Sequence, residues 1–119
     1  MKESPLNISP VEECILIIVN KSELYGLEII KALENGSGGK VKIGFGTLYP
    51  ALRRLEKKEF VETRWGDEIA EERGGARRKY YKISAKGASA LEEIGQIRAA
   101  LMNWQPASVQ THALRAIIS

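Results

Sequence analysis

Hydrophobic residues recur along the chain with two different periods, and each change of period marks a new element. Apolar residues three or four positions apart, the spacing of one helix face, occur at residues 24–33, 44–58 and 85–104. Two shorter stretches, residues 60–65 and 78–83, alternate apolar and polar positions as strands do. With a further helix at the start, the sequence predicts an α+β, mostly helical fold.

The most informative stretch is residues 44–58, in which Leu48, Leu52 and Leu55 fall at i, i+4 and i+7. This spacing predicts a short helix docked by one buried stripe. Its free face carries hydroxyls, one aromatic ring and cations, contributed by Thr47, Tyr49, Pro50, Arg53, Arg54 and Lys57. This mixture suits a phosphate backbone and base edges better than a catalytic site.

Turn and cap signals place the start of this helix. Glycines precede it, and Thr47 or Gly46 is expected to cap its first turn. Pro50 is expected in that first turn, where its missing N–H costs little.

The N-terminal helix begins with a strong capping signal. Ser9 is expected as N-cap, Pro10 as the first helical residue and Glu12 as the acid that completes a capping box. Residues 14–19 are apolar on nearly every side, so this helix should lie centrally and be covered on several faces. Because the run is β-branched, a buried strand is the alternative, and the cap decides for a helix.

The spacing of apolar residues over positions 24–33 predicts the second helix. Two inner faces fit its spacing, either Leu27, Ile30 and Leu33 or Leu24, Ile29 and Leu33. Gly26 in its first turn costs roughly 1 kcal/mol relative to Ala, so a close contact with a helix or a phosphate is expected there. A flexible linker at 35–39 and a short extended segment at 41–43 lead to the next helix.

Residues 60–65 and 78–83 predict an antiparallel hairpin whose connection, residues 66–77, is polar. Val61, Thr63 and Trp65 share one side of the first strand, and packing is the expected role of Trp65. The hairpin tip, residues 73–78, is basic. Two helices joined by a glycine turn and followed by a β-ribbon make a winged helix-turn-helix.

The last helix, residues 85–104, is expected to begin after Ser84 as cap. Its apolar stripe is directed away from a domain that already has a core, so a partner helix is its natural cover. The predicted divisions are an N-terminal arm that is frayed at 1–8, a winged helix-turn-helix at 9–84, a dimerisation helix at 85–104 and a C-terminal tail at 105–119. A short helix is expected within 108–119.

Composition bounds the function. With 119 residues and 44% apolar residues, the chain is one domain able to bury a core. It has no apolar run long enough to span a membrane and no apolar leader, so a cytoplasmic protein is expected. One cysteine and one histidine, far apart, argue against a disulfide and a zinc site. No nucleophile–base pair or phosphate loop is evident, so neither an enzyme nor a cofactor is expected.

The net charge of +3 is unevenly distributed. Residues 40–82 carry twelve Lys and Arg against seven Asp and Glu, a net charge of +5, whereas residues 1–39 carry −3 and residues 83–119 carry +1. A basic middle on a near-neutral chain indicates a local polyanion site. A solvated charged face is the alternative.

With this order in place, residues 24–33, 46–56 and 77–87 resemble the signature of the PadR family of bacterial transcriptional regulators. The Gly-Thr-Leu-Tyr-Pro block at 46–50 is its most specific part, and the match extends over about residues 10–95. The resemblance implies a homodimeric repressor, usually of a promoter near its own gene, with the last helix as dimerisation arm. With one such arm, the chain resembles the short-arm branch of the family.

Together, pattern and resemblance predict that these residues bind double-stranded DNA: Tyr25, Thr47, Tyr49, Pro50, Arg53, Arg54, Arg73, Arg77, Arg78 and Lys79. Adjacent arginines on a helix point about 100° apart, so one can reach a base edge or a phosphate while the other lies along the groove wall. Wing cations suit a narrow minor groove. The alternatives are capping for Thr47, packing for Tyr49 and Tyr25, and a sheet-facing position for Arg78 or Lys79.

The predicted homodimer interface consists of Leu91, Ile94, Ile97, Leu101 and Trp104. Because some relatives of the resembled family bind aromatic compounds at this interface, Trp104 is a candidate to stack on a small aromatic effector. A hydrophobic dimer contact is the alternative. Cys14 is expected to be an inert core thiol, and no role follows for His112. The competing function is a winged-helix protein-interaction module that does not bind DNA.

Overall fold

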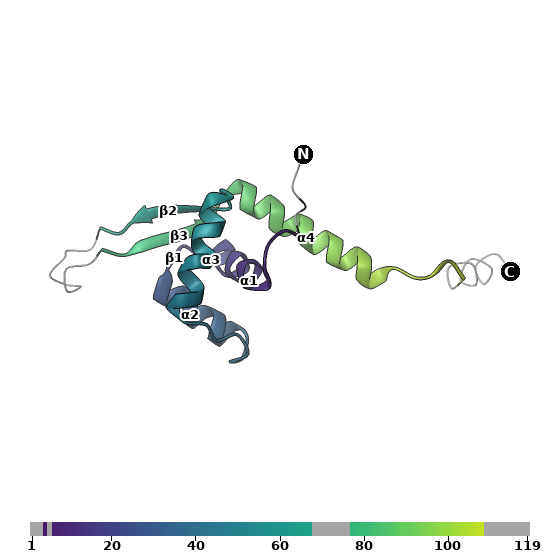
Figure 1. Ribbon diagram of the computed structural model, residues 1–119, viewed down its shortest axis with the longest axis horizontal. Coiled ribbons are helices and arrows are strands. Elements are labelled where there is room, and N and C mark those ends of the chain that lie inside the picture. Colours follow the sequence, from purple (N-terminus) through teal and green to yellow (C-terminus); the bar gives the residue numbers. More distant parts are fainter. Residues whose placement is uncertain (1–3, 5, 68–76, 109–119) are drawn as a thin grey trace.

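The computed structural model describes residues 4, 6–67 and 77–108, and it has the predicted α+β, mostly helical architecture (Figure 1). Its elements are α1 (Pro10–Lys21), β1 (Leu24–Tyr25), α2 (Gly26–Gly36), α3 (Phe45–Lys57), β2 (Val61–Trp65), β3 (Lys79–Ile83) and α4 (Ala85–Asn103). In Figure 1 the β2–β3 ribbon leaves the helical core to the left and α4 leaves it to the right. The predicted short helix within 108–119 lies outside the described residues, apart from its first position.

Helix α1 occupies the centre of the domain, as predicted. It packs against α2, α3, α4 and β3, and Ile15, Leu16 and Val19 are buried. Ser9 caps it, because the Ser9 hydroxyl accepts a hydrogen bond from the backbone N–H of Glu12 at 3.1 Å. The Glu12 carboxylate, however, does not complete a capping box; it bonds to α3 instead.

The second helix begins two residues later than predicted. Leu24 and Tyr25 form β1, which pairs antiparallel with β3. The Glu28 carboxylate accepts a hydrogen bond from the Tyr25 backbone N–H at 3.1 Å, so Tyr25 stays extended and α2 starts at Gly26. Of the two inner faces, the one with Ile29 is correct, since Ile29 is buried whereas Leu27 is 40% exposed.

A glycine turn connects α2 to α3, but its form differs from the prediction. Gly38 and Gly39 adopt positive φ angles of 66° and 83°, which side chains disfavour, so the turn is tight rather than an open linker. Residues 41–43 do not form a strand. The N-cap of α3 is Gly44, not Thr47 or Gly46, and Pro50 therefore lies in the second turn of the helix rather than the first.

Strands β2 and β3 form the predicted antiparallel ribbon, with β3 in the middle of a three-stranded sheet in the order β1-β3-β2. The expected inner face of β2 is buried only at Val61, and Trp65 is 56% exposed. Trp65 therefore does not pack in the core, and Lys79 Nζ lies 5.9 Å from the centre of its ring. The cause is that β1 is only two residues long and pairs with β3 only at Tyr80 and Tyr81. Among the described residues, the rest of the β2–β3 ribbon therefore has no third strand beside it.

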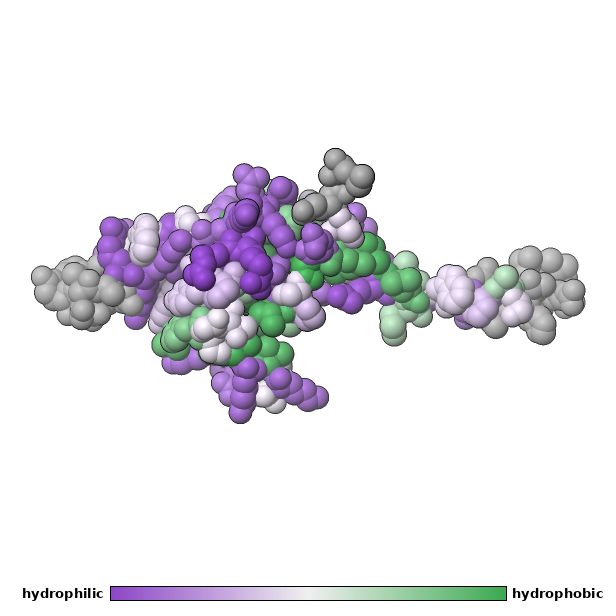
Figure 2. Space-filling view, in the orientation of Figure 1, coloured by the Kyte–Doolittle hydropathy of each residue, from purple (hydrophilic) through white to green (hydrophobic). Residues whose placement is uncertain are grey.

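Helix α4 begins after Ser84, whose hydroxyl accepts a hydrogen bond from the Gly87 backbone N–H at 2.9 Å. Its first half packs on the domain: Ile94 is 1% exposed and Leu91 packs against the core. The expectation that the whole stripe points away from the domain is therefore wrong for these two residues. The second half is open, since Leu101 is 68% exposed, and hydrophobic side chains gather where α4 leaves the domain (Figure 2).

At Asn7, a described residue of the N-terminal arm, the chain is tied down rather than frayed as expected. The Asn7 carbonyl accepts a hydrogen bond from Lys58 Nζ at 2.6 Å, which holds this part of the arm against the C-terminal end of α3.

Candidate nucleic-acid interface

Helix α3 is fixed to the domain by one continuous buried face. The three predicted leucines, Leu48, Leu52 and Leu55, are fully buried, and Ala51 between them is buried as well. Each leucine contributes about 1.5–3 kcal/mol by leaving water. This anchoring fixes the rotation of α3 about its own axis and determines which side chains face outward.

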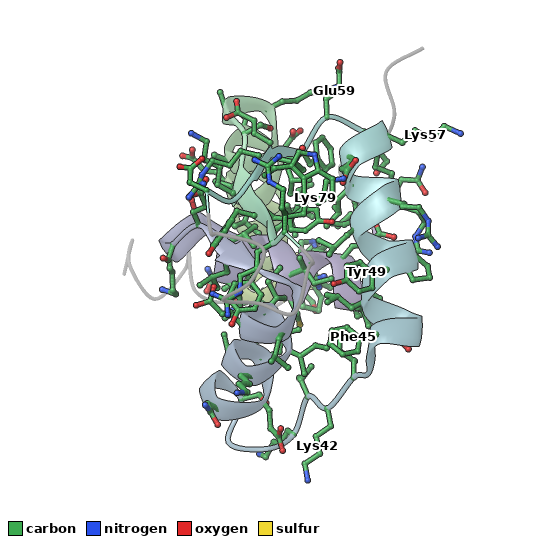
Figure 3. The ribbon with its side chains drawn as sticks, turned by 90° about the vertical axis from the view of Figure 1, so that its left-hand side faces the viewer. Lys42, Phe45, Tyr49, Lys57, Glu59 and Lys79 are labelled. Carbon is green, nitrogen blue, oxygen red and sulfur yellow. The ribbon has the colours of Figure 1, made fainter. Side chains whose placement is uncertain are left out.

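The outer face of α3 carries exposed polar and cationic side chains. Thr47, Arg53 and Lys57 are exposed, and Pro50 is half-buried between them. Lys57 points away from the domain at the far end of the helix (Figure 3). No ion pair or hydrogen bond holds the Arg53 side chain within residues 4, 6–67 and 77–108. Its guanidinium therefore keeps its donors for an external acceptor.

The two adjacent arginines differ sharply. Arg54 turns toward α1, where its Nε donates a hydrogen bond to Glu12 Oε1 at 2.7 Å. Lys58 Nζ donates to the other carboxylate oxygen of Glu12 at 3.2 Å. Burial alone would raise the pKa of Glu12, but these two bonds outweigh it and lower the pKa. The Arg54 side chain is still 51% exposed, so it keeps access to solvent.

Arg53 precedes Arg54 by one position, so the two side chains leave α3 about 100° apart around the helix axis. Burial raises the pKa of the Tyr81 hydroxyl to about 12, with smaller contributions from Glu56 and Tyr49, and the charge of Arg53 opposes the rise. Tyr49, Arg53 and Glu56 fall at i, i+4 and i+7 of α3, so they share one stripe of the helix. Glu56 also pairs with Lys79 at 3.0 Å.

Two aromatic rings stack at the start of α3. Phe45 and Tyr49 lie nearly parallel, with ring centroids 5.6 Å apart, and both lie on the side of α3 that faces the rest of the domain in Figure 3. Tyr49 is 39% exposed, and a Cβ at Gly26 would collide with its hydroxyl. The close contact predicted at Gly26 is therefore with α3, and Tyr49 serves packing while it still presents an edge to solvent.

Tyr25 lies within an aromatic and cationic cluster at the base of the ribbon. Its ring meets Tyr80 edge to face at 5.6 Å, and Arg78 lies over the Tyr25 ring at 4.3 Å. Arg64 covers Tyr80 at 4.5 Å and donates to Glu23 at 2.8 Å. The packing alternative for Tyr25 is thus present in the structure, and its DNA role stays a prediction.

The described wing residues are engaged mainly in holding the ribbon together. Arg77 donates two hydrogen bonds to the Gly66 carbonyl, at 3.0 and 3.2 Å. Lys79 pairs with Glu56 and lies 5.9 Å from the Trp65 ring centre, so it faces the sheet, as the alternative foresaw. Arg73 lies outside the described residues.

Sequence reasoning missed several residues that shape this surface. Phe45 is 49% exposed, and its i, i+4 relation to Tyr49 was the available signal. Lys57 was placed on the free face but not among the DNA contacts. Glu12 was assigned to local capping, and no local pattern could reveal partners more than forty residues away.

Other chemistries find little support in the part of the chain that is described. There, no group of three or more His, Cys, Asp or Glu residues could hold a metal ion. No helix among these residues is long and apolar enough to cross a bilayer. Cys14 is half-buried and packs against the core, as predicted.

Comparison with known proteins supports the same reading. Residues 15–93 match the model of the Transcriptional regulator PadR-like family. The transcriptional regulator YqjI of Escherichia coli is 34% identical over 79 residues, which are 66% of this chain and 34% of that protein. This chain therefore spans about a third of that relative.

Solved structures share the fold. A PadR-like transcription factor from Bacteroides fragilis matches with a TM-score of 0.66 at 32% identity, covering 76% of this chain and 82% of that one. Bacillus subtilis PadR, solved in complex with operator DNA, matches with a TM-score of 0.63 at 21% identity, covering 82% of this chain and 50% of that one. With its helix order, winged sheet and family match, the chain belongs to the PadR-like family of transcriptional regulators.

Proposed function

We propose that this protein is a repressor that binds a palindromic promoter site as a homodimer, with α3 of each protomer in a major groove. The observation that carries the proposal is the outer face of α3, where Arg53 is exposed on a helix whose rotation is fixed by three buried leucines. A guanidinium can bond the O6 and N7 of guanine, or a phosphate, through two parallel hydrogen bonds. The solved complex of Bacillus subtilis PadR with operator DNA supports this assignment.

The remaining contacts follow from position. Thr47 and the N-terminal backbone of α3 face the phosphates, Tyr49 presents a ring edge to a thymine methyl group, and Lys57 adds charge at the far end. In this proposal the wing cations Arg73, Arg77 and Arg78 contact an adjacent minor groove or its phosphates.

The test of DNA binding is a gel shift on duplexes from the region upstream of the gene, at fixed salt. Arg53→Ala combined with Arg54→Ala should abolish preference for the specific duplex. Because Glu12 loses its bond to Arg54, the melting temperature should fall, but a cooperative thermal unfolding transition should remain and show that the variant is folded. The matched control, Lys21→Ala with Arg98→Ala, removes two exposed cations outside α3 and the wing. Unchanged affinity in the first variant would favour a protein-interaction module instead.

The proposed homodimer uses the open half of α4. Leu101, Met102 and Trp104 are 67–85% exposed, and a second copy would cover them, with Ile97 at the edge and Leu91 and Ile94 supporting the arm from within the protomer. Two such protomers would present their α3 helices about 34 Å apart, matching successive turns of DNA. A monomer by light scattering at micromolar concentration would contradict this arrangement.

The proposal includes release by a small aromatic effector at Trp104, whose exposed indole offers a flat stacking surface. Planar aromatic compounds should quench Trp104 fluorescence and weaken the gel shift, and Trp104→Phe should reduce both effects. The second tryptophan, Trp65, lies on β2 and should not respond. If no such compound affects either signal, the Trp104 ring is a dimer contact alone.

A further inference from the structure

The described residues bury one charged side chain almost completely, the Glu12 carboxylate on α1, which is 3% exposed. Its Oε1 accepts the hydrogen bond from Arg54 Nε at 2.7 Å, and its Oε2 accepts from Lys58 Nζ at 3.2 Å. Lys58 Nζ also donates to the Asn7 carbonyl at 2.6 Å. The carboxylate is therefore held from two sides and cannot move without disturbing α3.

This arrangement determines how Arg54 meets the solvent. A guanidinium is planar and carries five N–H donors in a fixed fork, so a bond at Nε fixes the orientation of the whole plane. No second residue of the described chain bonds the Arg54 side chain, which is 51% exposed. The donors on its two Nη atoms are left for an acceptor outside the protein.

Buried ion pairs contribute little net stability, because desolvation offsets most of their attraction. The Glu12 pair does, however, restrict the conformation of Arg54. An unrestrained arginine samples many rotamers, and binding DNA would then cost the entropy of fixing one of them. The pKa of Glu12 stays low despite burial, so the carboxylate is charged throughout the physiological range.

We infer that Glu12 is a positioning residue for DNA recognition: it does not touch DNA, but holds the Arg54 guanidinium so that both Nη atoms face the duplex. This inference rests on the proposed function. It predicts a change in DNA-binding affinity opposite in direction to the change expected from charge alone. Removing a negative charge beside a DNA-binding helix should strengthen binding if only the overall field mattered. Loss of positioning instead weakens binding to the specific site.

The experiment measures affinity by fluorescence anisotropy for the specific duplex and for a scrambled duplex of equal length, at one salt concentration. Glu12→Gln should lower the ratio of the two affinities about tenfold, the scale of one well-formed bidentate contact. In an Arg54→Ala background, Glu12→Gln should change the ratio less than about twofold, because its effect acts through Arg54.

Glu13→Gln is the matched control. Glu13 is the next residue of α1 and forms an ion pair with Arg98 on α4 at 2.6 Å, so its loss removes the same charge and an ion pair without affecting α3. This variant should keep the wild-type ratio. Should Glu12→Gln prove too unstable, Glu12→Asp keeps the charge but withdraws the carboxylate by one methylene, and it should also lower the ratio.

The outcomes separate the inference from the function on which it rests. If the wild type does not distinguish the two duplexes, the proposed function fails and the inference fails with it. If Arg54→Ala lowers the ratio but Glu12→Gln and Glu12→Asp behave like Glu13→Gln, the inference alone is overturned. It is equally overturned if Glu12→Gln tightens binding to both duplexes by the same factor.

Discussion

The junction between the wing and α4 leaves no room for a side chain at Gly87, which makes Gly87→Ala a sensitive probe of the fold. A Cβ at Gly87 would collide with the Phe60 carbonyl oxygen and lie 2.9 Å from both the Phe60 carbonyl carbon and Ile83 Cγ1. The Phe60 carbonyl oxygen belongs to the backbone, so no side-chain rotation can move it away from the added methyl group. The Phe60 oxygen also accepts the hydrogen bond from the Ser84 N–H at 3.0 Å, which the displacement would strain.

The expected magnitude follows from these contacts. Forcing a methyl group into a packed site costs about 1–3 kcal/mol, and weakening the hydrogen bond from Ser84 costs about 1 kcal/mol more. Replacing glycine by alanine in a helix regains at most about 1 kcal/mol. Gly87→Ala should therefore reduce the free energy of unfolding by about 1–3 kcal/mol.

Gly95 provides the control on the same helix. Nothing lies within 4 Å of a Cβ at Gly95, so Gly95→Ala should stabilise the protein by up to about 1 kcal/mol through helix propensity. Thermal unfolding by circular dichroism, at equal protein concentration, should separate the variants by roughly 4 °C for each kcal/mol. A Gly87→Ala variant as stable as Gly95→Ala would refute the tight junction described here.

Three further predictions concern the core, pH and assembly. Leu52→Ala should cost about 2–5 kcal/mol in urea unfolding, because Leu52 is fully buried under α3, and a loss below 1 kcal/mol would mean that this anchor is not needed. The folded-state pKa of Glu12 lies below its usual value of 4.5, so its contribution to stability is present above pH 4.5 and disappears as pH falls through the folded-state pKa. The difference in melting temperature between wild type and Glu12→Gln should accordingly shrink from pH 7 to pH 3, and a constant difference would contradict the charged pair. Leu101→Asp places a charge on an exposed apolar position of α4, so it should give monomers by light scattering while the melting transition of the domain persists.

Periodicity was sufficient to predict α3, because Leu48, Leu52 and Leu55 encode both the helix and the face that it buries. The hairpin was equally predictable from alternation and glycines. The extra strand at Leu24 and Tyr25 was not, since their spacing fits a helix equally well. Only the pairing with β3 and the hydrogen bond that the Tyr25 N–H donates to Glu28 decide between strand and helix.

The site itself was predictable as a surface but not as a set of contacts. Sequence alone placed Arg53 and Arg54 outward together, whereas the structure gives Arg54 a partner on α1. That partner, Glu12, lies three residues after Ser9, a position that is typical of local capping. A hydrogen bond between residues far apart in the sequence produces no periodic pattern from which it could be predicted. The same limit applies to Lys79, whose partner Glu56 lies on another element.

The central claim is that the outer face of α3 binds the phosphates and bases of a duplex, and the salt dependence of binding tests it most directly. Arg53, Arg54 and Lys57 from two protomers would neutralise about six phosphates, so log K should fall with log salt at a slope of about −5 for the wild type. Arg53→Ala should reduce that slope by about 2 and lower the preference for the specific duplex. A wild-type slope near zero, or an Arg53→Ala variant with unchanged slope and preference, would contradict the account.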